Sequence, residues 1–333
     1  MRIVSLLASA TEIVCALDAG EFLAGRSHEC DNPAWVKQLP LCSEPTFDIS
    51  VSSRDIDTEV RRRIRAGEPL YNVHTDRIAS LAPDLILTQT HCDVCAVTPG
   101  DVERNGNCIA AAQMLVLSAS TVDEVFADVM RVADALDRQE KGRAVVAREQ
   151  QRLAALCRNT RNLRRPSVAV LEWTDPVFPM SNWGPELVEA ANGALVLGNE
   201  GQHSAAIPAT DVPTADPEYL VIAPCGFNLE RTIEELGVLQ RYPWWRELRS
   251  VREGKVAFAD GNLFFNRAGM TVVRTAEILA EILHGVVTGE RSEGRHWRWL
   301  TDLVSAHRPE CGREAPSAIT PLLAATRQTQ NTQ

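Results

Sequence analysis

No stretch of the sequence approaches the roughly 18 uninterrupted apolar residues that a membrane-spanning helix needs. Basic residues are also outnumbered by acidic ones: there are 34 Lys and Arg against 44 Asp and Glu, and the formal net charge is −10. A nucleic-acid surface needs clustered Lys and Arg, which this balance does not favour. We therefore expect neither membrane insertion nor nucleic-acid binding.

Three widespread functional motifs are absent as well. The sequence has no Gly-x-Gly-x-x-Gly after a strand, no phosphate-binding loop ending in Gly-Lys-Ser/Thr and no Gly-x-Ser-x-Gly elbow. These absences argue against the commonest dinucleotide, nucleotide and serine-hydrolase sites.

The first residues do not have the pattern of a secretory signal. Met1 and Arg2 lead directly into a strand-like run at 3–7, without the longer apolar stretch and the small-residue cleavage site of an export signal. We therefore expect a cytoplasmic protein, in which the nine cysteines would not form a disulfide framework. They would instead be buried small side chains, ligands or nucleophiles.

The two halves of the chain share a similar order of strand-like and helical patterns. Strand-like runs at 3–7 and 167–171 each lead towards a helical segment, and residues 81–88 are echoed by residues 215–223. This similarity indicates an approximate duplication into two lobes. Strands that alternate with helices form parallel sheets, whose ligands bind beyond the carboxyl ends of the strands.

Between the halves, residues 121–160 repeat apolar side chains at helical spacing with many charges outside, which is typical of a connector. A break near Gly142 would divide it into two helices. We predict an α/β protein of two Rossmann-like lobes with parallel sheets, joined by a long connecting helix, with a ligand cleft between the lobes. The predicted regions are an amino-terminal α/β lobe (1–120), the connecting helix (121–162), a carboxy-terminal α/β lobe (163–289) and a polar tail (290–333).

Four cysteines follow predicted strand ends and could meet in that cleft: Cys30, Cys92, Cys95 and Cys225. Four thiolates gathered from three loops are enough to hold zinc or an iron–sulfur cluster. Two alternatives stay open, because free cysteines are among the most buried residue types and a Cys-x-x-Cys pair can serve as a redox dithiol.

Other side chains near the predicted strand ends could contact a ligand. Trp173 and Trp183 suit a flat organic ligand, and Arg267 could meet an anionic group. His28 could bind metal or carry protons, and the same role is open to His91. Each has a structural alternative, such as a tryptophan that only covers the edge of the sheet. The predicted ligand-binding residues are His28, Glu29, Trp173, Asp175, Trp183, Phe265 and Arg267.

The run at 2–14 and the phrase at 78–87 resemble the first strand and helix, and the recurrent strand signature, of class III periplasmic binding proteins. This group contains vitamin B12, siderophore and haem binding proteins, among them substrate-binding proteins of ABC transporters. The chain is most similar to a cytosolic branch described as cobalamin-binding, to which the segments 27–31 and 92–95 correspond. The resemblance covers about residues 1–285 and implies a two-lobed clamp with a largely pre-formed cleft.

Three functions remain open from the sequence. The first is a binding protein that holds a corrinoid (cobalamin-like) or another metal-bearing small molecule in a cleft lined by Cys and Trp; the missing export signal argues against a transporter partner. The second is a metalloenzyme in which the four cysteines hold an iron–sulfur centre or zinc, with His28 or Glu29 moving protons. The third is a thiol-based redox or metal-storage module.

Overall fold

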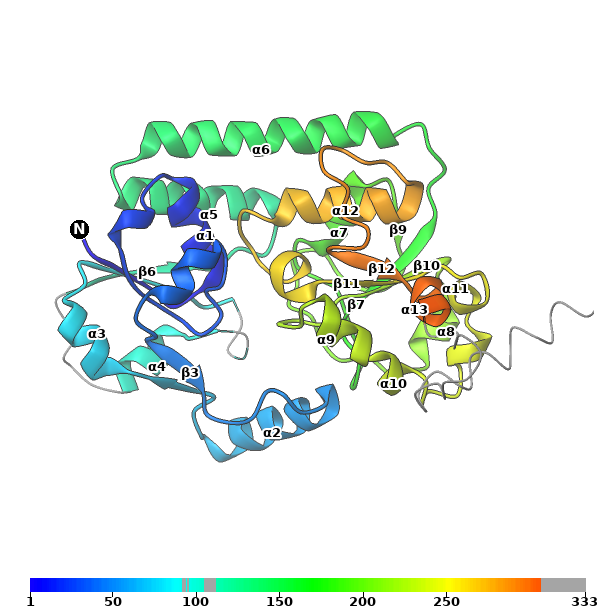
Figure 1. The fold of residues 1–333 in the computed structure, drawn as a ribbon, viewed down its shortest axis with the longest axis horizontal. Helices are drawn as coiled ribbons and strands as arrows, with labels where there is room; N and C mark the ends of the chain where they lie inside the picture. The colour runs from blue at the N-terminus through cyan, green and yellow to red at the C-terminus, as the bar shows by residue number, and fades with distance from the viewer. Residues whose placement is uncertain (92–93, 95, 105–111, 307–333) are drawn as a thin grey trace, which may run out of the picture.

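The computed structural model describes residues 1–91, 94, 96–104 and 112–306, and shows two α/β lobes side by side (Figure 1). A long helix runs along one side of both lobes and joins them. The two lobes and their connector agree with the fold class predicted from the sequence.

The amino-terminal lobe is built on a sheet in the order β2-β1-β5-β6, with all strands parallel. All five side chains of β5 are buried, because helices cover both faces of a parallel sheet and leave its central strands no polar face. The parallel sheet predicted from the alternating pattern is therefore confirmed here. The strands are β1 (Ile3–Ser5), β2 (Leu23–Arg26), β5 (Leu85–Gln89) and β6 (Gln113–Leu117).

The helices of this lobe include α2, a charged helix that begins after Ser52. The Ser52 hydroxyl accepts the backbone N–H of Asp55 at 3.2 Å, and Gly67 ends the helix in the left-handed region with a φ of 66°. A small antiparallel sheet of β3 and β4 flanks α2 along the chain. The bounds are α1 (Ala8–Ala16), α2 (Ser53–Ala66), α3 (Thr75–Leu81), α4 (Pro99–Arg104), β3 (Ser43–Pro45) and β4 (Tyr71–Val73).

The carboxy-terminal lobe has a mixed sheet in the order β12-β11-β10-β7-β8, with β9 also pairing with β7. Its central strands β11, β10 and β7 are parallel, whereas β12 and β8 run antiparallel to their neighbours. The strands are β7 (Ser167–Trp173), β8 (Phe178–Pro179), β9 (Ala194–Leu195), β10 (Tyr219–Ile222), β11 (Val256–Ala259) and β12 (Trp297–Trp299).

Two apolar cores cover the faces of this second sheet. Alternate β7 side chains separate them: Val168 and Val170 pack with α7 and α12, whereas Ala169 and Leu171 face the core that contains Trp245. The helices are α7 (Gly184–Ala190), α8 (Asp211–Ala215), α9 (Leu229–Glu234), α10 (Leu236–Leu239), α11 (Arg249–Arg252), α12 (Val272–His284) and α13 (Leu300–Ala306).

The lobe extends further along the chain than the predicted boundary at 289. The strand β12 completes the sheet edge and α13 follows it, with Trp297 and Leu300 almost fully buried. The polar tail predicted for 290–333 therefore does not begin at 290. Few apolar residues are buried in this segment, and many charged residues surround them in the sequence, so hydrophobic patterning does not reveal the strand and the helix.

The connector consists of α5 (Val122–Ala135) and α6 (Gln139–Thr160), which pack against each other. The chain turns at Asp137, whose φ of 55° is left-handed, rather than near Gly142 as predicted. Gly142 lies inside α6, where an added Cβ would stand 2.6 Å from the Cβ of Ala133. The glycine thus permits close approach of the two helices. None of the helices in the described residues has the length and apolarity that a membrane span requires.

Candidate functional site

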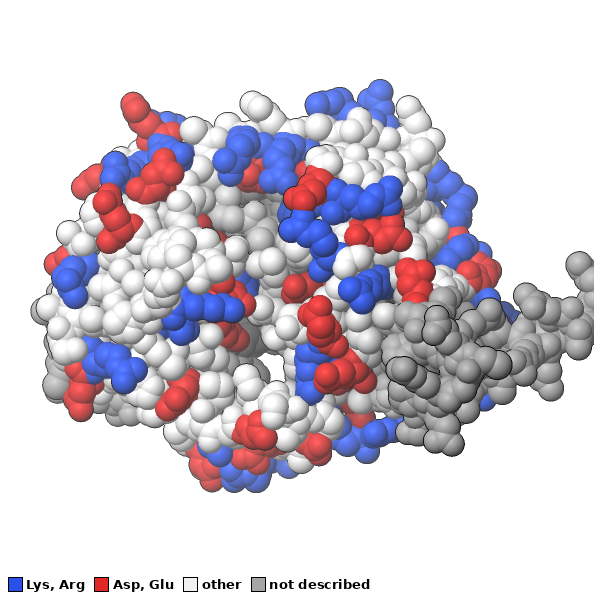
Figure 2. Space-filling model, in the orientation of Figure 1, with Lys and Arg blue, Asp and Glu red and all other residues white. Residues whose placement is uncertain are grey.

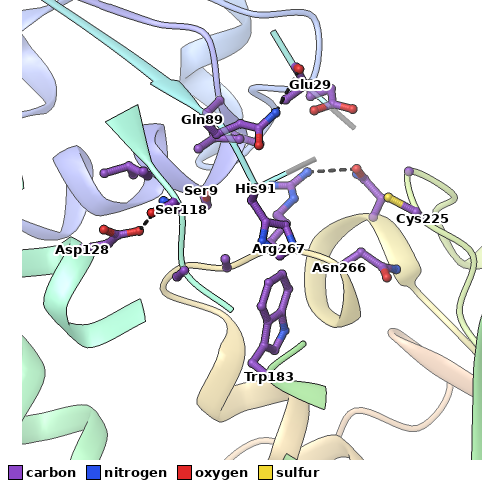
Figure 3. A pocket seen from close by; sticks show the side chains of 18 of the residues that line it. Ser9, Glu29, Gln89, His91, Ser118, Asp128, Trp183, Cys225, Asn266 and Arg267 are labelled. Carbon is purple, nitrogen blue, oxygen red and sulfur yellow. Dashed lines mark hydrogen bonds between the residues drawn. The ribbon is translucent and has the colours of Figure 1, made fainter. Parts of the chain in front are cut away.

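A pocket lies between the lobes, where loops from both sheets face each other, and the surface is hollowed there (Figures 2 and 3). It encloses about 670 Å³ of space with its open mouth included. Its walls come from segments that follow β1, β2, β5 and β6 in one lobe and β10 and β11 in the other. This is the position that parallel sheets predict for a ligand.

One wall of the pocket is aromatic. His91, just beyond β5, and Trp183, which precedes α7 in the other lobe, have ring centroids 5.5 Å apart (Figure 3). His203 approaches the same imidazole, with a centroid distance of 5.6 Å. Burial lowers the pKa of His91, and the nearby His203 lowers it further. His91 is therefore neutral at neutral pH, with Nδ1 3.5 Å from the Ser120 hydroxyl.

Arg267 crosses between the lobes at the pocket. Its guanidinium donates to Glu12 at 2.7 Å and to Asp31 at 2.6 Å, and also to Asn262 at 3.0 Å. Asn262 in turn donates to Asp31 at 2.8 Å. Only 6% of Arg267 is exposed, and its buried positive charge is compensated by the carboxylates of Glu12 and Asp31. An anionic group of a ligand, which the sequence predicts for Arg267, would therefore have to compete with the carboxylates of Glu12 and Asp31 for this guanidinium.

Glu29 and Cys225 line the same pocket from opposite lobes. Burial raises the pKa of Glu29 to about 7, although Arg267 opposes the shift. Burial also raises the pKa of the Cys225 thiol, and the nearby Glu29 and Glu172 raise it further. Cys225 is thus a neutral thiol at neutral pH, whereas a cysteine metal ligand is a thiolate.

Cys30 lies in the core of the amino-terminal lobe and does not line the pocket. Its Sγ accepts a hydrogen bond from Thr11 at 3.0 Å and lies 3.2 Å from the Ser27 hydroxyl. Cys92 and Cys95 fall outside the described residues. Within the described residues, no group of three or more His, Cys, Asp or Glu side chains is arranged to hold a metal ion. The four-cysteine centre therefore stays a prediction.

The structure gives four other predicted site residues positions away from the pocket lining. The His28 imidazole lies 3.4 Å from the Ser43 hydroxyl, and burial lowers its pKa to about 4. Phe265 is 1% exposed and belongs to a core of the carboxy-terminal lobe. Trp173 and Asp175 contact the start of α2 across the lobe boundary.

The chain matches the family model described as periplasmic binding protein over residues 3–263. It belongs to the periplasmic binding protein family. No curated protein matches the sequence.

Solved structures share this family fold at low sequence identity. A periplasmic haem-binding protein from Pseudomonas aeruginosa is 17% identical, with a TM-score of 0.66 over 87% of this chain and 95% of that chain. The periplasmic vitamin B12 binding protein of Vibrio cholerae is 16% identical, with a TM-score of 0.61 over 84% and 95%. An ABC-type Fe3+-hydroxamate transport protein from Saccharomonospora viridis is 18% identical, with a TM-score of 0.60 over 85% and 93%.

In this periplasmic binding protein, sequence reasoning missed several polar residues of the pocket. Asp128 on α5 is 4% exposed, accepts the backbone N–H of Ser118 at 3.2 Å and pairs with Arg131 at 2.8 Å. The sequence holds a signal for it, because Asp128 stands between Val125 and Val132 on the apolar face of the connector. The other missed polar residues are Ser9, Gln89, Ser118, Asn262 and Asn266.

Proposed function

We propose that this periplasmic binding protein holds a metal-bearing small molecule, a corrinoid such as cobalamin or a related macrocycle, in the pocket between its lobes. The observation that carries the proposal is the pairing of His91 with Trp183 on the pocket wall. The two residues offer a nitrogen ligand and a flat apolar surface to one bound molecule.

His91 has the properties of a ligand for cobalt or iron inside such a molecule. Its lowered pKa keeps the imidazole neutral at neutral pH, so a nitrogen lone pair is available. In the tautomer in which Nδ1 donates to the Ser120 hydroxyl, Nε2 is the nitrogen left for the metal. The apolar side chains around it, among them Leu7, Leu117 and Trp183, suit the hydrocarbon body of a macrocycle.

The names of the structural neighbours support the same class of ligand. They describe proteins that bind haem, vitamin B12 or Fe3+-hydroxamate. These three ligands share a metal ion held within an organic framework. A pocket that offers an imidazole, aromatic surface and few free charges fits a cobalamin-like or haem-like framework.

The test is titration of the purified protein with aquocobalamin and, separately, with haemin. We expect the visible absorption bands of one of these probes to shift on binding. We expect His91→Ala to weaken that binding at least about tenfold, since loss of a metal–nitrogen bond removes more than 1.4 kcal/mol. The control His74→Ala removes a histidine that lies just before α3, outside the pocket lining, and should bind like the unmodified protein. Equal binding by His91→Ala would refute the role of His91.

We also propose that the protein acts in the cytoplasm and passes its ligand on without a membrane transporter. Supporting this location, Cys15, Cys30, Cys42, Cys157 and Cys225 are all free thiols, a state that a reducing compartment maintains. Cell fractionation with an antibody against the protein tests the proposal. Recovery in the periplasmic fraction would contradict it.

A further inference from the structure

The lobes are also joined on the side of the cleft opposite α6. Helix α2 lies along that side, and its first turn reaches the carboxy-terminal lobe (Figure 1). We call this junction the clasp. It consists of Val51, Ser53 and Arg54 from one lobe and Trp173, Thr174, Asp175, Arg231 and Glu235 from the other.

The centre of the clasp is polar and buried. The Ser53 hydroxyl donates to the Glu235 carboxylate at 2.7 Å and lies 3.0 Å from the Thr174 hydroxyl, which also hydrogen-bonds to Glu235. Ser53 and Thr174 are fully buried and Glu235 is 2% exposed. Each of these three groups would lose a hydrogen-bond partner if the lobes moved apart.

The rim of the clasp adds contacts that cross the same boundary. Arg54 donates to Asp175 at 2.7 Å, and the Trp173 indole donates to the Ser53 carbonyl at 3.2 Å. Arg231 donates to the Val51 carbonyl, while its guanidinium lies 4.8 Å from the centroid of the Phe227 ring. The junction thus combines directional contacts with apolar packing, because Phe227 and Trp173 also pack against a core of the amino-terminal lobe.

No residue of the clasp lines the pocket. The clasp can therefore act on the movement of the lobes without touching a ligand. Its hydrogen bonds can be replaced by water when the lobes part, which makes opening reversible. With α6 on one side and the clasp on the other, the lobes cannot separate along the cleft while the clasp is formed.

We propose that the clasp gates ligand exchange: both entry into the pocket and release from it require the clasp to open. This inference rests on the proposed ligand-binding function of the same pocket. Because the clasp stabilises the closed form equally with or without ligand, loosening it raises both rates by the same factor. The dissociation constant then stays the same. A residue that touched the ligand would change mainly the release rate.

The first experiment loosens the clasp with Ser53→Ala, and follows aquocobalamin or haemin, whichever binds, by stopped-flow absorption. Entry and release should both accelerate by about tenfold, the factor that corresponds to one hydrogen bond to a charged group. The control Ser80→Ala removes a serine hydroxyl of the same lobe outside the clasp and should leave both rates unchanged. Unchanged rates in Ser53→Ala, or a change in release alone, would overturn the proposal.

The second experiment locks the clasp with Ser53→Cys and Thr174→Cys, whose parent hydroxyls are 3.0 Å apart. Once mass spectrometry has verified the disulfide, the oxidised protein should take up and release the probe at least about tenfold more slowly, because the disulfide holds the clasp closed. Dithiothreitol should restore the rates, and Ser53→Cys alone should not respond to oxidation. Equal rates before and after reduction would overturn the gate.

A third measurement does not need a ligand. In the empty protein, amide hydrogen exchange of segments 51–56 and 173–176 should be faster in Ser53→Ala and slower in the oxidised double-cysteine variant. Unchanged exchange in both variants would overturn the clasp whatever the ligand is. If neither probe binds while exchange responds as described, the proposed ligand fails and the opening clasp stands.

Discussion

Glu29 is a carboxyl group whose surroundings favour its neutral form. It lines the pocket close to Cys225, and burial raises its pKa from 4.5 to about 7. The folded chain therefore keeps this proton over a pH range in which the unfolded chain has lost it. The free energy of unfolding consequently falls as the pH rises from about 4.5 to about 7, and Glu29 contributes no further change outside that window.

The variant Glu29→Gln, which mimics the neutral acid, should remove this pH dependence. At pH 8 we expect it to be more stable than the unmodified protein by roughly 1–3 kcal/mol, and at pH 4.5 we expect no difference. Urea unfolding at both pH values measures this. The exposed Glu21→Gln serves as control and should follow the unmodified protein. Parallel curves for Glu29→Gln and the unmodified protein would show that Glu29 ionises freely.

Neighbouring residues near the site differ in which way they face, and the sequence does not encode this directly. Glu29 lines the pocket while Cys30, the next residue, turns into the core. Trp173 is the last residue of β7 and Trp183 follows β8, yet of the two only Trp183 lines the pocket, because Trp173 packs against Phe227 in the clasp region. The ends of strands could be predicted from hydrophobic patterning. The direction of a side chain in an irregular loop could not, because loop residues show no hydrophobic periodicity.

At the scale of elements, the connector depends on the close approach of α5 and α6. Gly142 lies where α6 meets Ala133 and Met130 of α5. The sequence predicted helices here from apolar spacing, and this is confirmed. Glycine weakens a helix interior, which is why the sequence predicts a break near Gly142, but packing against a neighbouring helix outweighs that preference.

The variant Gly142→Ala should be destabilised despite the better helix propensity of alanine. Its Cβ would lie 2.6 Å from the Ala133 Cβ, so α5 and α6 must move apart, at a cost of about 1–3 kcal/mol. Thermal unfolding by circular dichroism measures the loss. The matched control is Gly237→Ala in α10, where an added Cβ meets nothing within 4 Å. That variant should be unchanged or more stable by up to about 1 kcal/mol. A stabilised Gly142→Ala would contradict the packing argument.

At the scale of the whole molecule, the connector, the clasp and the Arg267 network all tie the lobes together. The connector could be predicted because it is one continuous helical pattern. The other two could not, since Arg54 and Asp175 are 121 positions apart and Arg267 and Glu12 are 255 positions apart. A single sequence carries no periodicity at such separations, and chemistry alone does not pair one arginine among many with one carboxylate.

The Arg267 junction should have the largest single effect on global stability. In Arg267→Met, the carboxylates of Glu12 and Asp31 lose their cation, and Glu12 is 4% exposed, so the expected loss is about 3–5 kcal/mol at pH 8. Removing the cation raises the pKa of Glu12, which burial already raises in the intact protein. The loss should therefore shrink towards pH 4.5, where Glu12 accepts a proton more readily.

Differential scanning calorimetry at the two pH values tests this effect, with Arg291→Met as the control. Arg291 pairs with Glu293 on the surface, where 62% and 33% of the two side chains are exposed, so its loss should change stability by less than about 1 kcal/mol. An Arg267→Met variant that resembled this control at pH 8 would mean that water enters the junction and solvates both carboxylates. In that case the connector and the clasp would carry more of the attachment between the lobes, and Ser53→Ala should then lower the melting temperature as well as accelerate ligand exchange.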